Sequence, residues 1–238
     1  MKKKIWTLGP VLSLLLWIAL SAGVLLVVFA TGQGSVMTPV RCNLSAPALL
    51  FLNLLPLLVT MGIVWSATGN LLWGGSASVL VWGLLSYVNL IKSEARGDPF
   101  VPGDILLVLE GVEAMGNYEL NIHPKVLLMI FGLTGMLLLA GFFVKSWKPS
   151  GKTRGFMALA LAVILVLAQC FCYSSDDLYK ALPGPDRNNV PQVYNTMGFP
   201  YAFLHNLNFN STIVPPGYSR QEAAGYEEIY RYRSNMCT

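Results

Sequence analysis

Long stretches without a charged residue constrain this chain more than any other feature. Residues 5–30 carry no charge and directly follow three lysines, and no charge occurs between Arg41 and Lys92. Only 12% of the 238 residues are charged, whereas soluble domains have roughly 25%. So few charges cannot cover a globular surface with polar groups. The chain is therefore predicted to be a polytopic membrane protein.

A membrane-spanning helix needs roughly 20 consecutive apolar residues. The run between Arg41 and Lys92 is too long for one such helix and fits two, separated by the turn-like sequence SATGN at residues 66–70. The sequence thus predicts an all-α polytopic membrane protein with five transmembrane helices, at about residues 5–30, 46–65, 71–91, 126–144 and 155–173.

The first of these segments also has features of a secretory signal peptide. Three lysines precede it, and Val28-Phe29-Ala30 resembles a small-residue cleavage site. However, the apolar region of a signal peptide is only about 7–15 residues long. The length of this segment favours an uncleaved first helix.

The charges indicate how the helices are oriented. With five helices and a cytoplasmic N-terminus, the cytoplasmic segments contain seven basic residues and no acid, and every Asp and Glu lies on the other side. This is the positive-inside pattern. It predicts a multi-pass protein of the cell membrane with an extracytoplasmic C-terminus. Nucleic acid is not expected as a partner, because no basic patch is interleaved with aromatic residues.

A dense polar sequence, NLIKSEARGDPFVPGD at residues 89–104, opens a long external loop that spans residues 92–124. Gly97 and Pro99 predict a turn, because glycine tolerates positive φ and proline restricts the residue before it. Asp104 is placed to act as an N-cap. Residues 105–117 then show helical periodicity, with acidic residues on one face, and this predicts an amphipathic helix at the membrane interface.

The charged groups of this loop are the candidate site. One interpretation is a solvated loop face with a helix cap, since surface loops are polar by default. The other is a docking surface for an anionic lipid headgroup or an attached external domain, with Lys92 best placed at the end of a membrane helix. The candidate residues are Asn89, Lys92, Arg96, Asp98, Asp104 and Glu110.

The chain carries no recognisable catalytic motif, since it lacks GxSxG, P-loop, HExxH and dinucleotide-binding signatures. Its four cysteines form no CxxC pair, and neither histidine lies at zinc-ligand spacing from one. Residues 174–238 are polar, aromatic and rich in Pro, Asn and Gly. They are predicted to form an irregular extracytoplasmic linker, which ends in a short helix from about Ser219 with a capping box.

In three features the chain resembles the lipoteichoic acid synthase family, the bacterial membrane phosphoglycerol transferases. These are five membrane helices followed by an external linker, the loop sequence VNLIKSEARGDPFVPGDILLVLEGVEAMGNY, and the tail sequences MGFPYAFLHNLN and PPGYSRQEAAGYEEIYRY. The resemblance implies a bacterial plasma membrane and transfer of glycerol phosphate from phosphatidylglycerol. A sulfatase-like external domain with a threonine nucleophile and a divalent metal would perform that transfer.

Such a domain would begin shortly after Arg233, and the sequence stops five residues later. The expectation is therefore a non-catalytic membrane-anchoring module without a catalytic residue or cofactor of its own. The divalent metal would belong to the missing domain. The implied partners are membrane lipid, including phosphatidylglycerol, and a separate sulfatase-like domain or protein. A natural truncation, a fragment and one half of a split enzyme all fit.

Two alternatives remain open at this stage. A small transporter or flippase-type protein would place ionisable residues in the middle of its helices, but the interiors of the predicted helices hold only Asn53 and Gln169 as stronger polar groups. An accessory membrane protein or an inert remnant would have the same composition as an anchoring module.

Overall fold

A computed structural model describes residues 6–32, 35–106, 121–148 and 150–208. Five of its helices are long and apolar enough to cross a membrane. They are α1 (Pro10–Ala30), α3 (Pro47–Thr68), α4 (Leu71–Arg96), α7 (Pro124–Phe143) and α8 (Gly151–Ala168), which continues through a π-helical turn, η1 (Gln169–Tyr173). The predicted all-α polytopic membrane fold with five spanning helices is confirmed.

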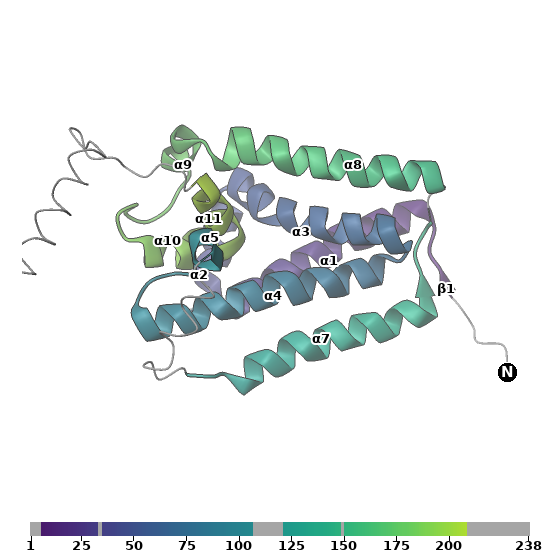
Figure 1. Ribbon diagram of the computed structural model, residues 1–238, viewed down its shortest axis with the longest axis horizontal. Helices are drawn as coiled ribbons and strands as arrows, with labels where there is room; N and C mark the ends of the chain where they lie inside the picture. The colour runs from purple at the N-terminus through teal and green to yellow at the C-terminus, as the bar shows by residue number, and fades with distance from the viewer. Residues whose placement is uncertain (1–5, 33–34, 107–120, 149, 209–238) are drawn as a thin grey trace, which may run out of the picture. The chain divides into compact units, whose positions relative to one another are not determined.

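Two helices form the centre of the bundle. Helices α3 and α4 pack against each other, α1 packs on both, α7 packs on α4, and α8 packs on α3 (Figure 1). The apolar windows of α3 and α4 are 56% and 61% buried, whereas those of α7 and α8 are 17% and 6% buried. The outer helices therefore keep most of their apolar side chains available to lipid, which a soluble protein would not tolerate.

Local sequence sets the ends of these helices. Pro10 occupies the first turn of α1, where a missing N–H is not needed, so this helix begins five residues later than the predicted residue 5. Gly69 ends α3 and Gly97 ends α4, at φ values of 74° and 75°. Both are left-handed conformations that suit glycine, and Gly97 confirms the predicted turn.

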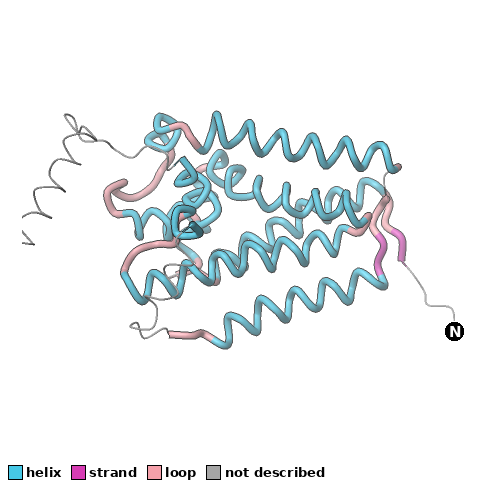
Figure 2. The backbone as a smooth tube through the Cα atoms, in the orientation of Figure 1, coloured by secondary structure: helices cyan, strands magenta, loops and turns pink. Residues whose placement is uncertain are grey.

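One end of the bundle carries the basic residues of the 145–154 segment, and we call it the basic end. Here two short strands, β1 (Trp6–Thr7) and β2 (Val144–Lys145), form a parallel pair in which Trp6 lies opposite Val144. Figure 2 shows these strands as the magenta segments beside the ends of α7 and α8. The Arg154 guanidinium donates to the carbonyls of Ser66 and Ala67 at the end of α3, a favourable position for a cation.

Among the described residues, short helices gather at the opposite end, which we call the capped end (Figure 1). They are α2 (Met37–Ser45), α5 (Pro102–Leu106), α9 (Asp176–Ala181), α10 (Val190–Met197) and α11 (Phe199–His205), and α11 leads into a 3₁₀ turn, η2 (Asn206–Asn208). The predicted interfacial helix over residues 105–117 lies almost entirely outside the described residues, and only its first two residues fall in α5.

The prediction of an irregular linker from residue 174 is wrong for the described part of that segment. Residues 176–181, 190–197 and 199–205 are helical. Ser175 and Asn189 cap α9 and α10, accepting from the backbone N–H groups of Leu178 and Gln192. Each helix is too short to show clear periodicity in the sequence, and its stability depends on packing. The helix predicted from Ser219 lies outside the described residues.

Candidate functional site

The polar loop that follows α4 folds back onto that helix through three side chains. Lys92 Nζ lies 2.6 Å from Asp104 Oδ2 and donates to the Pro99 carbonyl at 2.9 Å. Asn89 Oδ1 accepts from the Phe100 N–H at 2.8 Å. The side chains of Lys92 and Asp104 are only 20% and 26% exposed. The loop is therefore held in one conformation by an ion pair and hydrogen bonds that are partly shielded from water.

Asp104 stabilises the start of α5, but not as the predicted N-cap. Helix α5 begins at Pro102, so Asp104 is its third residue. Its carboxylate accepts from the Val101 N–H at 2.7 Å, which is the role of the acidic residue in a capping box. The sequence predicted a helix that begins at Ile105, directly after Asp104. The observed helix begins three residues earlier, at Pro102, because proline suits the first turn of a helix.

The structure thus brings together three of the predicted site residues: Asn89, Lys92 and Asp104. Arg96 and Asp98 are exposed on either side of Gly97, and Glu110 lies outside the described residues. The charge of Lys92 is balanced by Asp104, and this favours an architectural role for these two residues over direct binding of a lipid phosphate.

A second contact next to this loop involves residues that sequence reasoning did not single out. Glu94 Oε2 lies 2.7 Å from His123 Nε2, and the His123 N–H donates to the Tyr87 hydroxyl at 3.1 Å. These contacts join the start of α7 to the last turns of α4. A single sequence gives no sign of them, because the partners lie 29 and 36 residues apart.

Two buried asparagines hold the tail against the bundle, and we call Asn43 and Asn53 the asparagine pair. Asn53, in the second turn of α3, is fully buried, and its Nδ2 donates to Asn43 Oδ1 at 2.8 Å and to the Met197 carbonyl at 2.8 Å. Its Oδ1 accepts from the Tyr201 N–H at 3.0 Å. Asn43 Nδ2 donates to the Met197 carbonyl at 3.1 Å. The pair therefore satisfies the backbone where α10 meets α11.

Asn53 and Gln169 are the two strongly polar side chains in the interiors of the predicted helices, and both form hydrogen bonds with this tail. Gln169 Nε2 donates to the Leu204 carbonyl at 3.0 Å, at the other end of α11. A buried amide inside a membrane helix needs a hydrogen-bonding partner. That need is the signal by which the docking of α11 could have been anticipated.

Aromatic packing completes the attachment of the tail. The rings of Tyr179 and His205 stack at a centroid distance of 4.0 Å, and His205 Nδ1 lies 2.7 Å from the Tyr173 carbonyl. Arg187 lies over the Tyr179 ring, with 4.5 Å between its Cζ and the ring centroid. Burial raises the pKa of the Tyr194 and Tyr201 hydroxyls, so both stay neutral at physiological pH.

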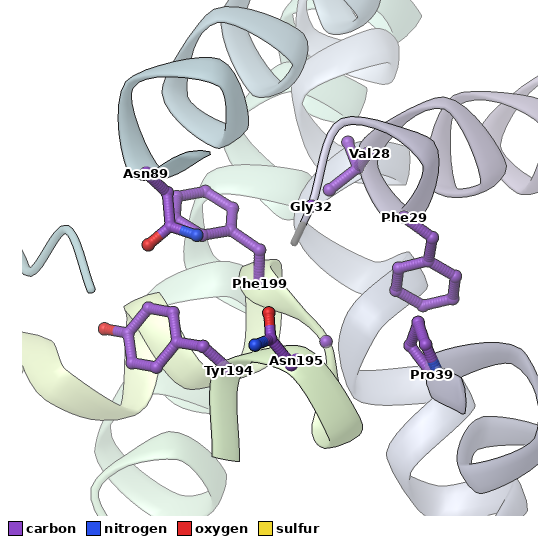
Figure 3. Close-up of a pocket in the computed structure, with 9 residues that line it drawn as sticks. Val28, Phe29, Gly32, Pro39, Asn89, Tyr194, Asn195 and Phe199 are labelled. Carbon is purple, nitrogen blue, oxygen red and sulfur yellow. The ribbon is translucent and has the colours of Figure 1, made fainter. Parts of the chain in front are cut away.

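A small pocket opens at the capped end where α1, α2, α4, α10 and the start of α11 meet (Figure 3). Apolar and aromatic side chains form most of its wall, and Asn89 and Asn195 contribute carboxamides. Its space is about that of one water molecule. We call it the Asn89 pocket.

Within the described ranges, no group of three or more His, Cys, Asp or Glu side chains is arranged to hold a metal ion. No family model, no curated protein and no solved structure matches the chain. The comparisons thus identify no family, and the resemblance to the phosphoglycerol transferases stays a prediction.

Proposed function

We propose that this chain is a non-catalytic membrane-anchoring module of a phosphoglycerol-transferase type of protein. It would fix the segment that follows the last span to one end of the helix bundle. In the family that the sequence resembles, this segment leads to the external sulfatase-like domain. A fixed segment would hold such a domain close to its lipid substrate.

The observation that carries this proposal is the attachment of residues 176–205 to the bundle. A flexible tether would need only a polar, unpacked chain. Here, Phe199, Tyr201 and Phe203 are buried. The asparagine pair and Gln169 form hydrogen bonds with backbone groups of this segment. Buried polar contacts of this kind favour a single defined arrangement of the segment on the bundle. A segment that positions another domain needs such an arrangement.

Charge placement supports the proposed orientation. The basic end holds Lys145, Lys148, Lys152 and Arg154 and no described acidic residue, whereas the capped end holds both acidic and basic residues. By the positive-inside rule, the capped end would be extracytoplasmic, in a bacterial plasma membrane. This agrees with an external partner domain.

A transporter or flippase is less well supported. Along the described spans, Asn53, Ser78 and Ser86 are buried and their side chains donate hydrogen bonds inside the protein. A substrate pathway needs polar or ionisable groups that remain accessible to the substrate. These three side chains instead hold the bundle and its tail together.

A chimera tests the proposal. A sulfatase-like phosphoglycerol transferase domain is joined after Arg233, and transfer of glycerol phosphate from phosphatidylglycerol in vesicles is compared with that of the same domain free in solution. Anchoring raises the effective concentration at the membrane, so we expect faster transfer by the chimera. Asn53→Ala should reduce this advantage, while hydrolysis of a water-soluble glycerol phosphate ester stays unchanged.

The matched control is Asn121→Ala, whose exposed amide contacts Glu94 and does not touch the tail. Thermal unfolding of each variant in detergent separates release of the tail from loss of the fold. The proposal is wrong if the chimera and the free domain transfer at the same rate, or if Asn53→Ala keeps the full advantage with its tail released.

A further inference from the structure

The oxygen and the nitrogen of the Asn89 carboxamide face different surroundings. Asn89 is only 3% exposed, and its Oδ1 accepts from the Phe100 N–H. That bond fixes which end of the carboxamide is oxygen, so Nδ2 faces the other way, towards the Asn89 pocket (Figure 3). Within the part of the chain that the structure describes, Nδ2 has no hydrogen-bond partner. A donor that faces the pocket without a protein partner is available to a group that occupies this space.

A second carboxamide, that of Asn195, lines the same pocket. Asn195 lies on α10 and is partly buried, and its side chain makes no hydrogen bond with another described residue. A carboxamide offers both a donor and an acceptor. Together, the two side chains present donors and an acceptor to one small space.

The rest of the lining determines which chemistry fits. No charged side chain lines the pocket, and Val28, Phe29 and Phe199 make much of the wall apolar. A charged group would lose its hydration there without a counter-ion, which is costly. The space admits a group about as large as one water molecule. An uncharged hydroxyl, which both accepts and donates, meets all of these conditions.

The position of the pocket relates it to membrane lipid. It lies at the end of α1 and near the last turns of α4, where apolar spans give way to polar loops and where the polar layer of a bilayer begins. We propose that the Asn89 pocket binds a single uncharged hydroxyl of a polyol, carried by a lipid headgroup or by free glycerol. This site goes beyond the anchoring function and does not depend on it.

Native mass spectrometry of the full chain tests this inference. The protein in detergent is mixed with four lipids that have the same acyl chains: glucosyl diacylglycerol, phosphatidylglycerol, phosphatidylserine and phosphatidylcholine. The first two carry free hydroxyls in their headgroups, and the last two do not. We expect roughly threefold to tenfold stronger retention of the hydroxylated lipids, the factor that one or two hydrogen bonds supply.

Two variants place the binding in the pocket. Asn195→Leu fills the space and removes one carboxamide, and Asn89→Asp keeps the acceptor for the Phe100 N–H while removing the donor. Both should abolish the preference for hydroxylated lipids, and Asn121→Ala, remote from the pocket, should keep it. Thermal unfolding identifies any variant that has lost its fold. If Asn89→Asp does so, Asn195→Leu decides the test.

Free glycerol distinguishes the two sources of the hydroxyl. If glycerol displaces the hydroxylated lipids, the site also binds the free polyol. The same conclusion holds if the protein shows no lipid preference but binds glycerol, and Asn195→Leu removes that glycerol binding. Lipid preference that glycerol does not reduce assigns the site to headgroups. Equal retention of phosphatidylglycerol and phosphatidylserine, together with no glycerol binding, overturns the inference, as does a preference that survives in a folded Asn195→Leu variant.

Discussion

Gly198 joins α10 to α11 in a backbone conformation that side-chain-bearing residues rarely adopt. Its φ is 103°, and a Cβ built on it would lie 2.8 Å from Phe29 Cε1 and 2.9 Å from Asn53 Oδ1. The absence of a side chain thus allows the tail to turn directly over the asparagine pair. Gly198 itself leaves room for the close approach, and the backbone groups of Met197 and Tyr201 make the hydrogen bonds with Asn53.

Gly198→Ala should therefore destabilise the protein. We expect a loss of roughly 1–3 kcal/mol from backbone strain alone, and the close contacts with α1 and α3 add to it. Thermal unfolding in detergent measures the change. Gly103→Ala is the matched control, because Gly103 lies at the same end with open space around it and no positive φ. Equal stability of the two variants would contradict this account of Gly198.

At the scale of the element, the loop between α4 and α5 is held by the pairing of Lys92 with Asp104. The two side chains are 12 residues apart in the sequence, and the turn at Gly97 brings them together. This pairing explains why the sequence at residues 89–104 is polar: its charged groups hold the loop against α4. Glu94, Arg96 and Asp98 are exposed charges of the same sequence, and Glu94 contacts His123.

A double-mutant cycle on Lys92→Met and Asp104→Asn tests this pairing. A partly shielded ion pair with a short hydrogen bond should give a coupling energy of about 1 kcal/mol in unfolding measurements. Asp98→Asn, on the exposed turn, should change stability by less than about 0.5 kcal/mol. A coupling energy near zero, together with weaker retention of anionic lipid by Lys92→Met, would instead favour the lipid-phosphate role for Lys92.

At the scale of the whole molecule, the two ends of the bundle differ in how they are closed. In the described part of the chain, short turns and two small strands close the basic end, whereas five short helices cover the capped end. Burial among these helices raises the pKa of Tyr179, Tyr194 and Tyr201 above the usual value of about 10. The tail is thus attached through groups that must remain uncharged.

The attachment should weaken in alkaline solution. Because these folded-state pKa values are raised, their contribution to stability is complete below about pH 10 and is lost as the pH rises above it. Hydrogen exchange of residues 190–205, measured from pH 8 to about pH 11 and corrected for its intrinsic pH dependence, should show this loss of protection.

Tyr201→Phe provides the comparison for this experiment. The Tyr201 hydroxyl is buried and has no hydrogen-bond partner among the described residues, so its removal should be tolerated at neutral pH. Because one group with a raised pKa is then absent, protection should fall less steeply above pH 10 than in the wild type. Identical pH profiles would show that ionisation of Tyr201 does not contribute.

The helical tail shows where sequence reasoning reached its limit. Long apolar runs predict the five spans, because crossing a bilayer imposes a minimum length on each segment. The ends of the helices were predicted less accurately than the helices themselves. At Pro10 and Pro102, for example, proline sets a helix start that differs from the predicted one by a few residues. Helices α10 and α11 have 8 and 7 residues and are too short for a periodic signal to emerge.

The candidate site could also be predicted only in part from the sequence. The polar sequence at residues 89–104 was visible as a dense set of charges, and its turn at Gly97 followed from glycine chemistry. Its pairing scheme was not visible, because a single sequence does not show which acid meets Lys92. Asn53 stood out as a polar residue in an apolar helix, but its partners at residues 197 and 201 are 144 and 148 positions away.

The sequence alone determined that the chain is an all-α membrane protein with five spans, because the hydrophobic length of each segment is a local property. Only the tertiary structure decided that residues 176–205 lie on the bundle and that Lys92 is paired. It also revealed the small pocket into which the Asn89 amide points. These features depend on contacts between distant residues, whose hydrogen bonds and packing form only when the chain is folded.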